Sequence, residues 1–238
     1  MRALPVFVAV LIVIAAAWFF LLRSDDTGEA PVAETAGMEA DVQTATTAEE
    51  EEPLPEVVTL TTNVDEIVSM FENAAWVHRG DAGPVLYVVS FRSCPTCLAF
   101  KEAELHGLED AGVDVRWIIY ARRDREGRER SSPAERAVQA ELALTRDWSL
   151  FEDWYAVDPA TYYATADLPP LAEGDPAREA AVEEARAFVE RLSDLYDENN
   201  VDLYIPTLLW QQDGDWNTYV GYEETSFAPV REFLTTSR

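Results

Sequence analysis

The fold is decided by the stretch VLYVVSFRSCPTC, which runs from Val85 to Cys97. It begins as an apolar, β-branched run typical of a buried strand and ends in the dithiol motif Cys94-Pro95-Thr96-Cys97. Because proline is favoured at the first position of a helix, the motif indicates a helix start. The first sulfur then faces unpaired amide donors and the positive end of the helix dipole, which favours a nucleophilic thiolate on Cys94. Cys97, about one turn further, is placed to attack a mixed disulfide formed on Cys94.

The motif contains the only two cysteines of the chain, so neither can be committed to a bridge elsewhere. The motif has two alternative interpretations: it could be half of a zinc site, or it could be two buried cysteines without a chemical role. Structural zinc requires four ligands, whereas the only histidines, His78 and His106, form no close pair in the sequence. We therefore expect a catalytic redox-active disulfide between Cys94 and Cys97, with no metal and no other cofactor.

Three neighbours of the cysteines are expected to modulate them. Pro95 begins the helix and leaves its amide donors pointing at the Cys94 sulfur. Thr96 can tune the thiolate through its hydroxyl or its amide, or it simply fills the helix. Arg92 adds positive potential near the thiolate, or it is a solvated loop charge. Each unit by which the thiol pKa is lowered favours the thiolate by about 1.4 kcal/mol.

The charge balance excludes one class of partner. The chain has 238 residues and a net charge of −27, from 45 acidic and 18 basic residues, and Lys101 is its only lysine. Nucleic acids bind proteins through cations that neutralise phosphates, so we expect no nucleic acid partner. The apolar fraction of 48% is ample for a folded core.

The first residues predict a membrane anchor. Residues 3–22 carry no charge and are long enough to cross the bilayer as one helix. A cleaved signal peptide is the alternative, but the small residues Ala15–Ala17 lie inside the apolar run and not after it. We expect residues 1–23 to anchor the chain once in the inner (cytoplasmic) membrane. The redox pair favours a soluble part in the periplasm or extracytoplasmic space.

Two further regions follow the anchor. Residues 24–56 contain hardly any large apolar residue and end in an acidic run, which predicts a disordered acidic tether. Residues 57–238 predict a folded domain with a helical insertion at about residues 123–203.

Periodicity and turn signals order the elements of this domain. We expect helices over Asn63–Trp76, from Cys94 to about Gly112, from the capping box Ser132–Glu135 onward, from Asp175-Pro176 onward, and over Phe227–Leu234. We expect strands over Val85–Phe91, Val113–Tyr120, Tyr204–Gln211 and Trp216–Val220, with an irregular stretch at residues 158–174. The short strand–helix–strand crossover implies that its two strands are parallel. The turn Asp213-Gly214 implies an antiparallel hairpin.

This order of elements resembles the thioredoxin fold, an α/β fold. The residues themselves are most similar to bacterial thiol:disulfide interchange proteins of the periplasmic disulfide isomerase (Dsb) kind. Three stretches carry the resemblance: Val88–Cys97, Gly112–Arg122 and Tyr204–Thr207. It implies a helical insertion between the second parallel strand and the strand that follows Pro206.

The resemblance also implies a substrate-binding element. In that family the proline before the third strand is cis and packs against the disulfide. Carried over, Pro206 would be cis, and Ile205 would offer its backbone groups to the substrate chain. The dimeric isomerases of the family have a sizeable amino-terminal dimerisation domain, whereas here only residues 57–84 precede the first strand. We therefore expect a monomer.

The predicted function is that of a membrane-tethered thiol–disulfide oxidoreductase, which exchanges disulfides with exported proteins and with a membrane redox partner. The redox direction stays open. One alternative is a dedicated electron relay for a single envelope partner, for example in cytochrome maturation. The other is a non-catalytic, chaperone-like binding module that has kept the fold.

Overall fold

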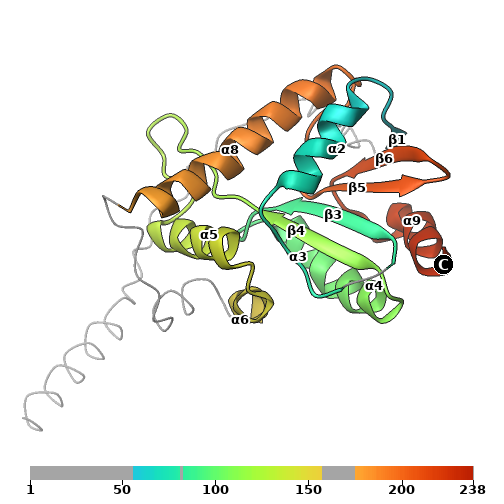
Figure 1. Cartoon of the computed structure of the whole chain (residues 1–238), viewed down its shortest axis with the longest axis horizontal. Coiled ribbons are helices and arrows are strands. Elements are labelled where there is room, and N and C mark those ends of the chain that lie inside the picture. Colours follow the sequence, from blue (N-terminus) through green and yellow to red (C-terminus); the bar gives the residue numbers. More distant parts are fainter. Residues whose placement is uncertain (1–55, 81–82, 157–174, 238) are drawn as a thin grey trace, which may run out of the picture. The chain divides into compact units, whose positions relative to one another are not determined.

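The computed structural model describes residues 56–80, 83–156 and 175–237 (Figure 1). All of them belong to the unit that spans residues 51–238. The predicted membrane anchor, the acidic tether up to Pro55 and the stretch at residues 158–174 lie outside the described residues. Within the described part, no helix is long and apolar enough to cross a membrane.

A mixed sheet forms the centre of the described unit, with the strand order β1-β6-β5-β3-β4-β2. Its strands are β1 (Val57–Thr59), β2 (Trp76–Val77), β3 (Val85–Ser90), β4 (Asp114–Ile119), β5 (Thr207–Gln212) and β6 (Asp215–Val220). β3 pairs with β4 in parallel and with β5 in antiparallel fashion, and β5 and β6 form an antiparallel hairpin. The predicted parallel pair and hairpin are therefore confirmed. The order β6-β5-β3-β4, with this connectivity, is that of a thioredoxin-like fold.

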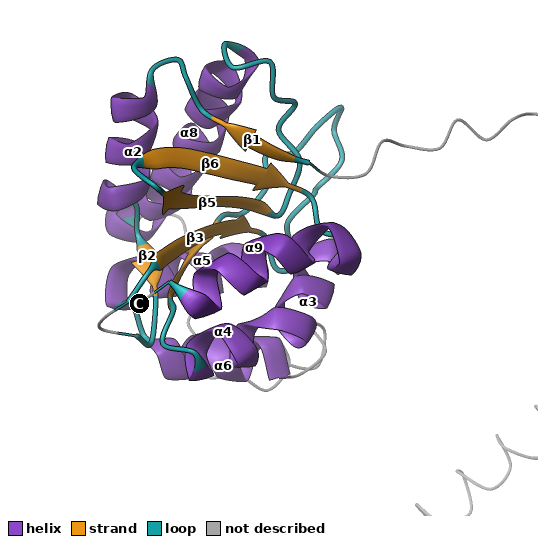
Figure 2. Ribbon diagram, turned by 90° about the vertical axis from the view of Figure 1, so that its right-hand side faces the viewer, coloured by secondary structure: helices purple, strands orange, loops and turns teal. Residues whose placement is uncertain are grey.

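Helices cover both faces of this sheet (Figures 1 and 2). One face carries α2 (Val64–Asn73) and α8 (Pro176–Asp197). The other carries α3 (Pro95–Phe100), the π-helical segment η1 (Lys101–Leu105), α4 (His106–Asp110), α6 (Trp148–Ala156) and α9 (Glu224–Thr236). The remaining helix of the described part, α5 (Pro133–Thr145), packs against α8 and against β2 and β4.

The position of strand β3 in the sheet explains why its sequence is apolar at nearly every position. Leu86 and Val88 contribute to the core cluster under α3, α6 and α9, whereas Tyr87 and Val89 contribute to the cluster under α2 and α8. All four side chains are at most 2% exposed. A central strand that is covered on both faces has no solvent side, so polar residues do not alternate along it.

Three boundaries correct the sequence predictions. Helix α2 ends at Asn73 and not at Trp76, because Ala74 is extended and Trp76 pairs with Ile118 as strand β2. Strand β5 begins at Thr207 and not at Tyr204, because Pro206 has no amide hydrogen to donate to the ladder. Helix α9 begins at Glu224, earlier than predicted, with the Glu223 carboxylate capping its first turn.

The predicted starts of α5 and α8 are both found. Ser132 Oγ accepts the Glu135 amide at 3.1 Å, and Asp175 Oδ1 accepts the Arg178 amide at 3.2 Å. In a full capping box the Glu135 carboxylate would accept the Ser132 amide. Here it accepts a hydrogen bond from the Ser93 hydroxyl at 3.4 Å. At the carboxyl end of α8, the side chains of Leu192, Leu195 and Tyr196 are buried in the core cluster under α2 and α8.

Candidate active site

Strand β3 delivers the cysteine pair to the start of helix α3, as predicted. Cys94 is the N-cap residue of α3 and Pro95 occupies its first turn. The Cys94 amide donates to the Phe91 carbonyl at 3.1 Å, which closes the turn between strand and helix. The two cysteines form a disulfide, with their Cα atoms 5.3 Å apart.

The environment of the two sulfurs differs. The Cys97 amide donates to Cys94 Sγ at 3.2 Å, so a helix-start donor points at the first sulfur. Cys94 is 3% exposed, whereas Cys97 is fully buried. An incoming thiolate can therefore reach the pair only through the small exposed part of Cys94.

A second element, the chain before strand β5, closes over the first sulfur. The Ile205–Pro206 peptide bond is cis, as the resemblance implies. The Ile205 carbonyl oxygen lies 3.5 Å from Cys94 Sγ, and Pro206 is buried. The Pro206 carbonyl accepts the Gly221 amide at 2.7 Å, which ties this segment to the end of β6. The neighbouring Tyr204 is 63% exposed and stands at the rim of the site.

The residues predicted to modulate the cysteines have different surroundings. Arg92 is 3% exposed, so its interpretation as a solvated loop charge is wrong. Its Nε donates to the Trp154 carbonyl at 3.0 Å, and its guanidinium lies 4.8 Å from the centre of the Tyr155 ring. Arg92 thereby attaches α6 to the loop that carries the cysteines. Pro95 is exposed and Thr96 is half-buried.

A polar network beside Cys94 was missed by sequence reasoning. Arg122 Nη2 donates to Ser93 Oγ at 3.0 Å, and Ser93 Oγ donates to the Glu135 carboxylate at 3.4 Å. Burial raises the pKa of Glu135, while its hydrogen bonds with Ser131 and Ser93 and the nearby Arg122 oppose this shift. One available signal was that Arg122 follows β4, because the carboxyl ends of adjacent parallel strands meet at one edge of a sheet.

A groove of about 520 Å³ has Ile205 in its lining, whereas neither cysteine lines it. Its apolar lining comes from Phe91, Tyr120, Val189 and the segment Leu203–Ile205. Its charged lining comes from Arg122, Arg123, Asp124, Arg125, Arg130, Arg186 and Glu190. Burial raises the pKa of Tyr120 to about 12 although Arg122 and Arg130 act in the opposite direction.

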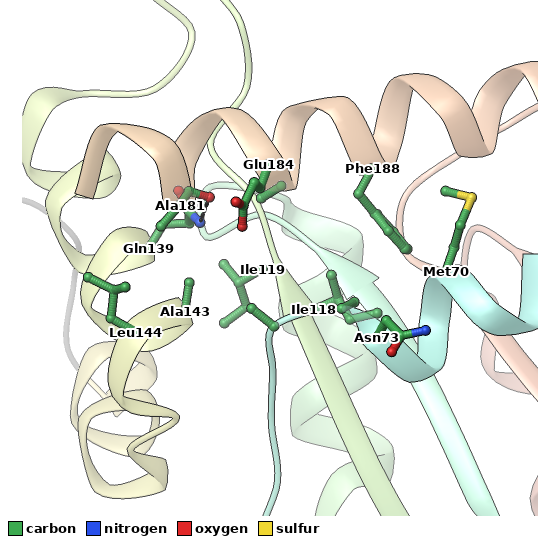
Figure 3. A pocket seen from close by; sticks show the side chains of 13 residues that line it. Met70, Asn73, Ile118, Ile119, Gln139, Ala143, Leu144, Ala181, Glu184 and Phe188 are labelled. Atoms are coloured by element: carbon green, nitrogen blue, oxygen red, sulfur yellow. Dashed lines mark hydrogen bonds between the residues drawn. The ribbon is translucent and has the colours of Figure 1, made fainter. Parts of the chain in front are cut away.

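A separate pocket of about 310 Å³ lies between α2, α5 and α8 (Figure 3). Its lining is largely apolar and includes Phe188 and Met70, and Glu184 is the one ionisable side chain among its described lining residues. Gln139 is 1% exposed and donates to the Ala181 carbonyl at 3.3 Å. The cysteines do not line this pocket, so it is distinct from the candidate active site.

The two histidines contact different residues, and neither contact involves a cysteine. His78 Nδ1 lies 2.9 Å from the buried Asp114 carboxylate, and the exposed His106 lies near Glu109. In the described part of the chain, no group of three or more His, Cys, Asp or Glu residues could hold a metal ion.

No family model matches the chain, and no curated protein matches it either. Among solved structures it is similar to the catalytic domain of Proteus mirabilis ScsC, with a TM-score of 0.47 and 13% identity over 74% of this chain and 97% of that one. A periplasmic thioredoxin-like protein from Salmonella enterica serovar Typhimurium matches with a TM-score of 0.42 and 14% identity, over 73% and 98% of the two chains. Chlamydia trachomatis DsbA matches with a TM-score of 0.38 and 14% identity, over 69% and 91%. We therefore infer the chemistry of the site from this chain's own residues.

Proposed function

We propose that the chain is a thiol–disulfide oxidoreductase that exchanges its Cys94–Cys97 disulfide with cysteines of exported proteins. One observation carries the proposal: Cys94 Sγ lies between the Cys97 amide, at 3.2 Å, and the Ile205 carbonyl, at 3.5 Å. The amide stabilises negative charge on the sulfur when Cys94 is the leaving group. The carbonyl belongs to the chain segment on which a substrate backbone would lie.

In the oxidising direction, a substrate thiolate attacks Cys94 Sγ. A bond forms between these two sulfurs, the Cys94–Cys97 bond breaks, and Cys97 leaves as a thiolate that takes up a proton. A second substrate thiolate then attacks the substrate sulfur of the mixed disulfide and releases Cys94. Two electrons pass from the substrate dithiol to the protein. The same steps in reverse reduce a substrate disulfide.

The neighbouring residues have supporting roles in this proposal. Pro95 starts the helix and so fixes the Cys97 amide against the Cys94 sulfur. Thr96 and Arg92 adjust the thiolate, Arg92 through a guanidinium that is held beneath α6. Ile205 and Pro206 position the substrate chain beside Cys94.

The thiolate of Cys94 can be titrated directly by its ultraviolet absorbance in the reduced protein. We expect a Cys94 pKa below the value of about 8.5 for free cysteine. A pKa at or above that value would remove the mechanism. Reduction of insulin and refolding of a scrambled substrate would then measure activity, with Cys94→Ser as the inactive control.

A Cys97→Ser variant is expected to hold its substrates as stable mixed disulfides on Cys94, because the resolving thiol is missing. Many captured exported proteins would support a broad exchange enzyme, and a membrane redox protein among them would identify the partner that regenerates it. A single captured partner would indicate a dedicated relay. Full function in cells after Cys94→Ser would contradict exchange chemistry and indicate a binding module.

We further propose that residues 1–23 anchor this monomer in the inner membrane, with the domain on the oxidising side. The support is the uncharged run at residues 3–22 and a redox pair that needs an oxidising compartment. Membrane fractions extracted at alkaline pH should retain the full chain and release a variant that lacks residues 1–23. A full chain that stays in the soluble fraction would refute the anchor.

A further inference from the structure

We propose that the groove beside the disulfide selects substrates whose reactive cysteine is flanked by aspartate or glutamate. This inference rests on the proposed exchange function and names the class of polypeptide that it serves. It depends on the charged segment of residues 122–130, RRDREGRER, which we call the arginine loop. Five of the 18 basic residues of the chain lie in this loop.

The arginine loop has a defined conformation in the described structure. Arg125 and Arg128 exchange two backbone hydrogen bonds, of 3.1 and 3.0 Å. The two residues between them, Glu126 and Gly127, both have positive φ, at 55° and 72°, which is typical of a type I′ turn. At the base of the loop, the Arg122 amide donates to Ser131 Oγ at 2.9 Å. The arginines are therefore presented by a tight hairpin.

Two contacts place the groove next to the active site. Ile205, whose carbonyl lies 3.5 Å from Cys94 Sγ, is one of the lining residues of the groove. Arg122, which forms part of its wall, donates to Ser93, the residue directly before Cys94. A polypeptide joined to Cys94 by a mixed disulfide would thus have the residues next to its cysteine close to this groove.

The charges that line the groove do not balance. Five arginines and two acidic residues, Asp124 and Glu190, contribute to its lining. Arg123 pairs with Glu190 and Glu183, and Arg186 pairs with Glu183 at 2.7 Å. Neither Arg122 nor Arg130 forms an ion pair with any residue that the structure describes, and Arg130 is exposed.

A guanidinium group without an ion pair, such as that of the exposed Arg130, favours carboxylates, which it can bind through two parallel hydrogen bonds. The chain as a whole, at a net charge of −27, repels acidic polypeptides. A local positive surface beside Cys94 would therefore guide an acidic segment to the one place where its cysteine can react. Apolar contact with Tyr204 and Phe91 would complete the binding of the flanking residues.

The test compares two reduced peptides that each contain one cysteine and differ only in the flanking residues, aspartate and glutamate in one and asparagine and glutamine in the other. The rate of attack on the oxidised full chain is measured for each peptide, in detergent and at low salt. We compare the ratio of the two rates between wild type and Arg125→Ser/Arg130→Ser, so that the intrinsic reactivity of each peptide cancels. We expect the acidic-to-neutral ratio to fall roughly fivefold in this variant.

The matched control is Arg79→Ser. Arg79 is an exposed arginine with Glu152 at 3.6 Å, as Arg125 is an exposed arginine with Glu126 at 3.7 Å. Arg79 follows β2, which is antiparallel to β4 and therefore runs toward the amino end of β4. The arginine loop follows the carboxyl end of β4, so the two sites lie at opposite ends of this strand. This variant should keep the wild-type ratio. In wild type alone, 1 M salt should abolish most of the acidic preference, because charges are then screened within about 3 Å.

The outcomes separate this inference from the function on which it rests. No reaction with either peptide would refute the exchange function itself. Reaction with both peptides, at a ratio that neither the double variant nor salt changes, would overturn the acidic preference alone.

Discussion

The active-site helix is joined to the last helix by a buried carboxylate, and this contact gives the sharpest stability prediction. Glu104 on η1 is 1% exposed at its side chain, and both of its oxygens accept hydrogen bonds from the Arg231 guanidinium on α9. The Tyr222 hydroxyl also donates to Glu104 Oε1 at 2.7 Å. The Arg231 side chain is 37% exposed, so the two partners of this pair differ in their access to water.

The difference in exposure predicts unequal effects of removing each partner. Arg231→Met leaves a buried carboxylate with one remaining donor, Tyr222. Breaking a fully buried pair costs about 3–5 kcal/mol, and because Arg231 is partly solvated we expect a loss of about 3 kcal/mol. Glu104→Gln leaves an amide that still accepts from Tyr222, and Arg231 can turn to water, so we expect a loss of about 1 kcal/mol.

Reversible urea unfolding of the full chain, followed by tryptophan fluorescence, measures both losses as changes in the free energy of unfolding. The double variant Glu104→Gln/Arg231→Met should lose less than the sum of the two single losses, because the neutral amide that replaces the Glu104 carboxylate no longer needs a cation. Equal losses for the two single variants, or additive losses in the double variant, would refute the view that Arg231 compensates a buried charge.

Three further perturbations test separate parts of the fold. Gly83→Ala should cost at least about 3 kcal/mol, because Gly83 has φ +131° and an added Cβ would lie 1.9 Å from the Gly112 carbonyl oxygen; a near-neutral urea midpoint would contradict this. Tyr196→Phe should cost about 1 kcal/mol in the same assay, because it removes the 2.8 Å hydrogen bond to Thr218 in the core. Burial raises the pKa of Tyr120 from 10.0 to about 12, so its contribution to stability is present below pH 10 and is lost as the pH rises from 10 to 12. Tyr120→Phe should remove that part of the alkaline loss, as measured by unfolding free energies between pH 9 and 12, and an unchanged alkaline profile would contradict the assignment.

The centre of the fold was predictable because its signals are local. The apolar run of β3 predicts a strand buried on both faces, and the proline between the cysteines predicts the helix start that follows. The turn Asp213-Gly214 has φ of 55° and 96°, values that the Asp-Gly pair favours in two-residue hairpins. Each of these features is decided by residues adjacent in the sequence.

The features that were missed depend on contacts distant in the sequence. Strands β1 and β2 have three and two residues, too few to show a period, and they exist because β6 and β4 offer unpaired edges. The sequence predicts that Glu104 is an exposed residue of a helix. Its side chain is buried because α9 packs against this segment. Glu135 has the signature of a capping box, yet its carboxylate turns to Ser93 because the loop before Cys94 lies beside α5.

The redox direction depends on two opposing contacts of one sulfur. The Cys97 amide at 3.2 Å favours a thiolate on Cys94, whereas the Ile205 carbonyl at 3.5 Å directs its negative end at the same sulfur and favours the thiol. A dominant amide stabilises the reduced protein and makes the disulfide a better oxidant, while a dominant carbonyl makes the reduced protein a better donor of electrons. A substrate chain seated in the arginine-lined groove would add its own carboxylates near this sulfur, and the guanidinium groups of Arg122 and Arg130 would offset their effect on the thiolate.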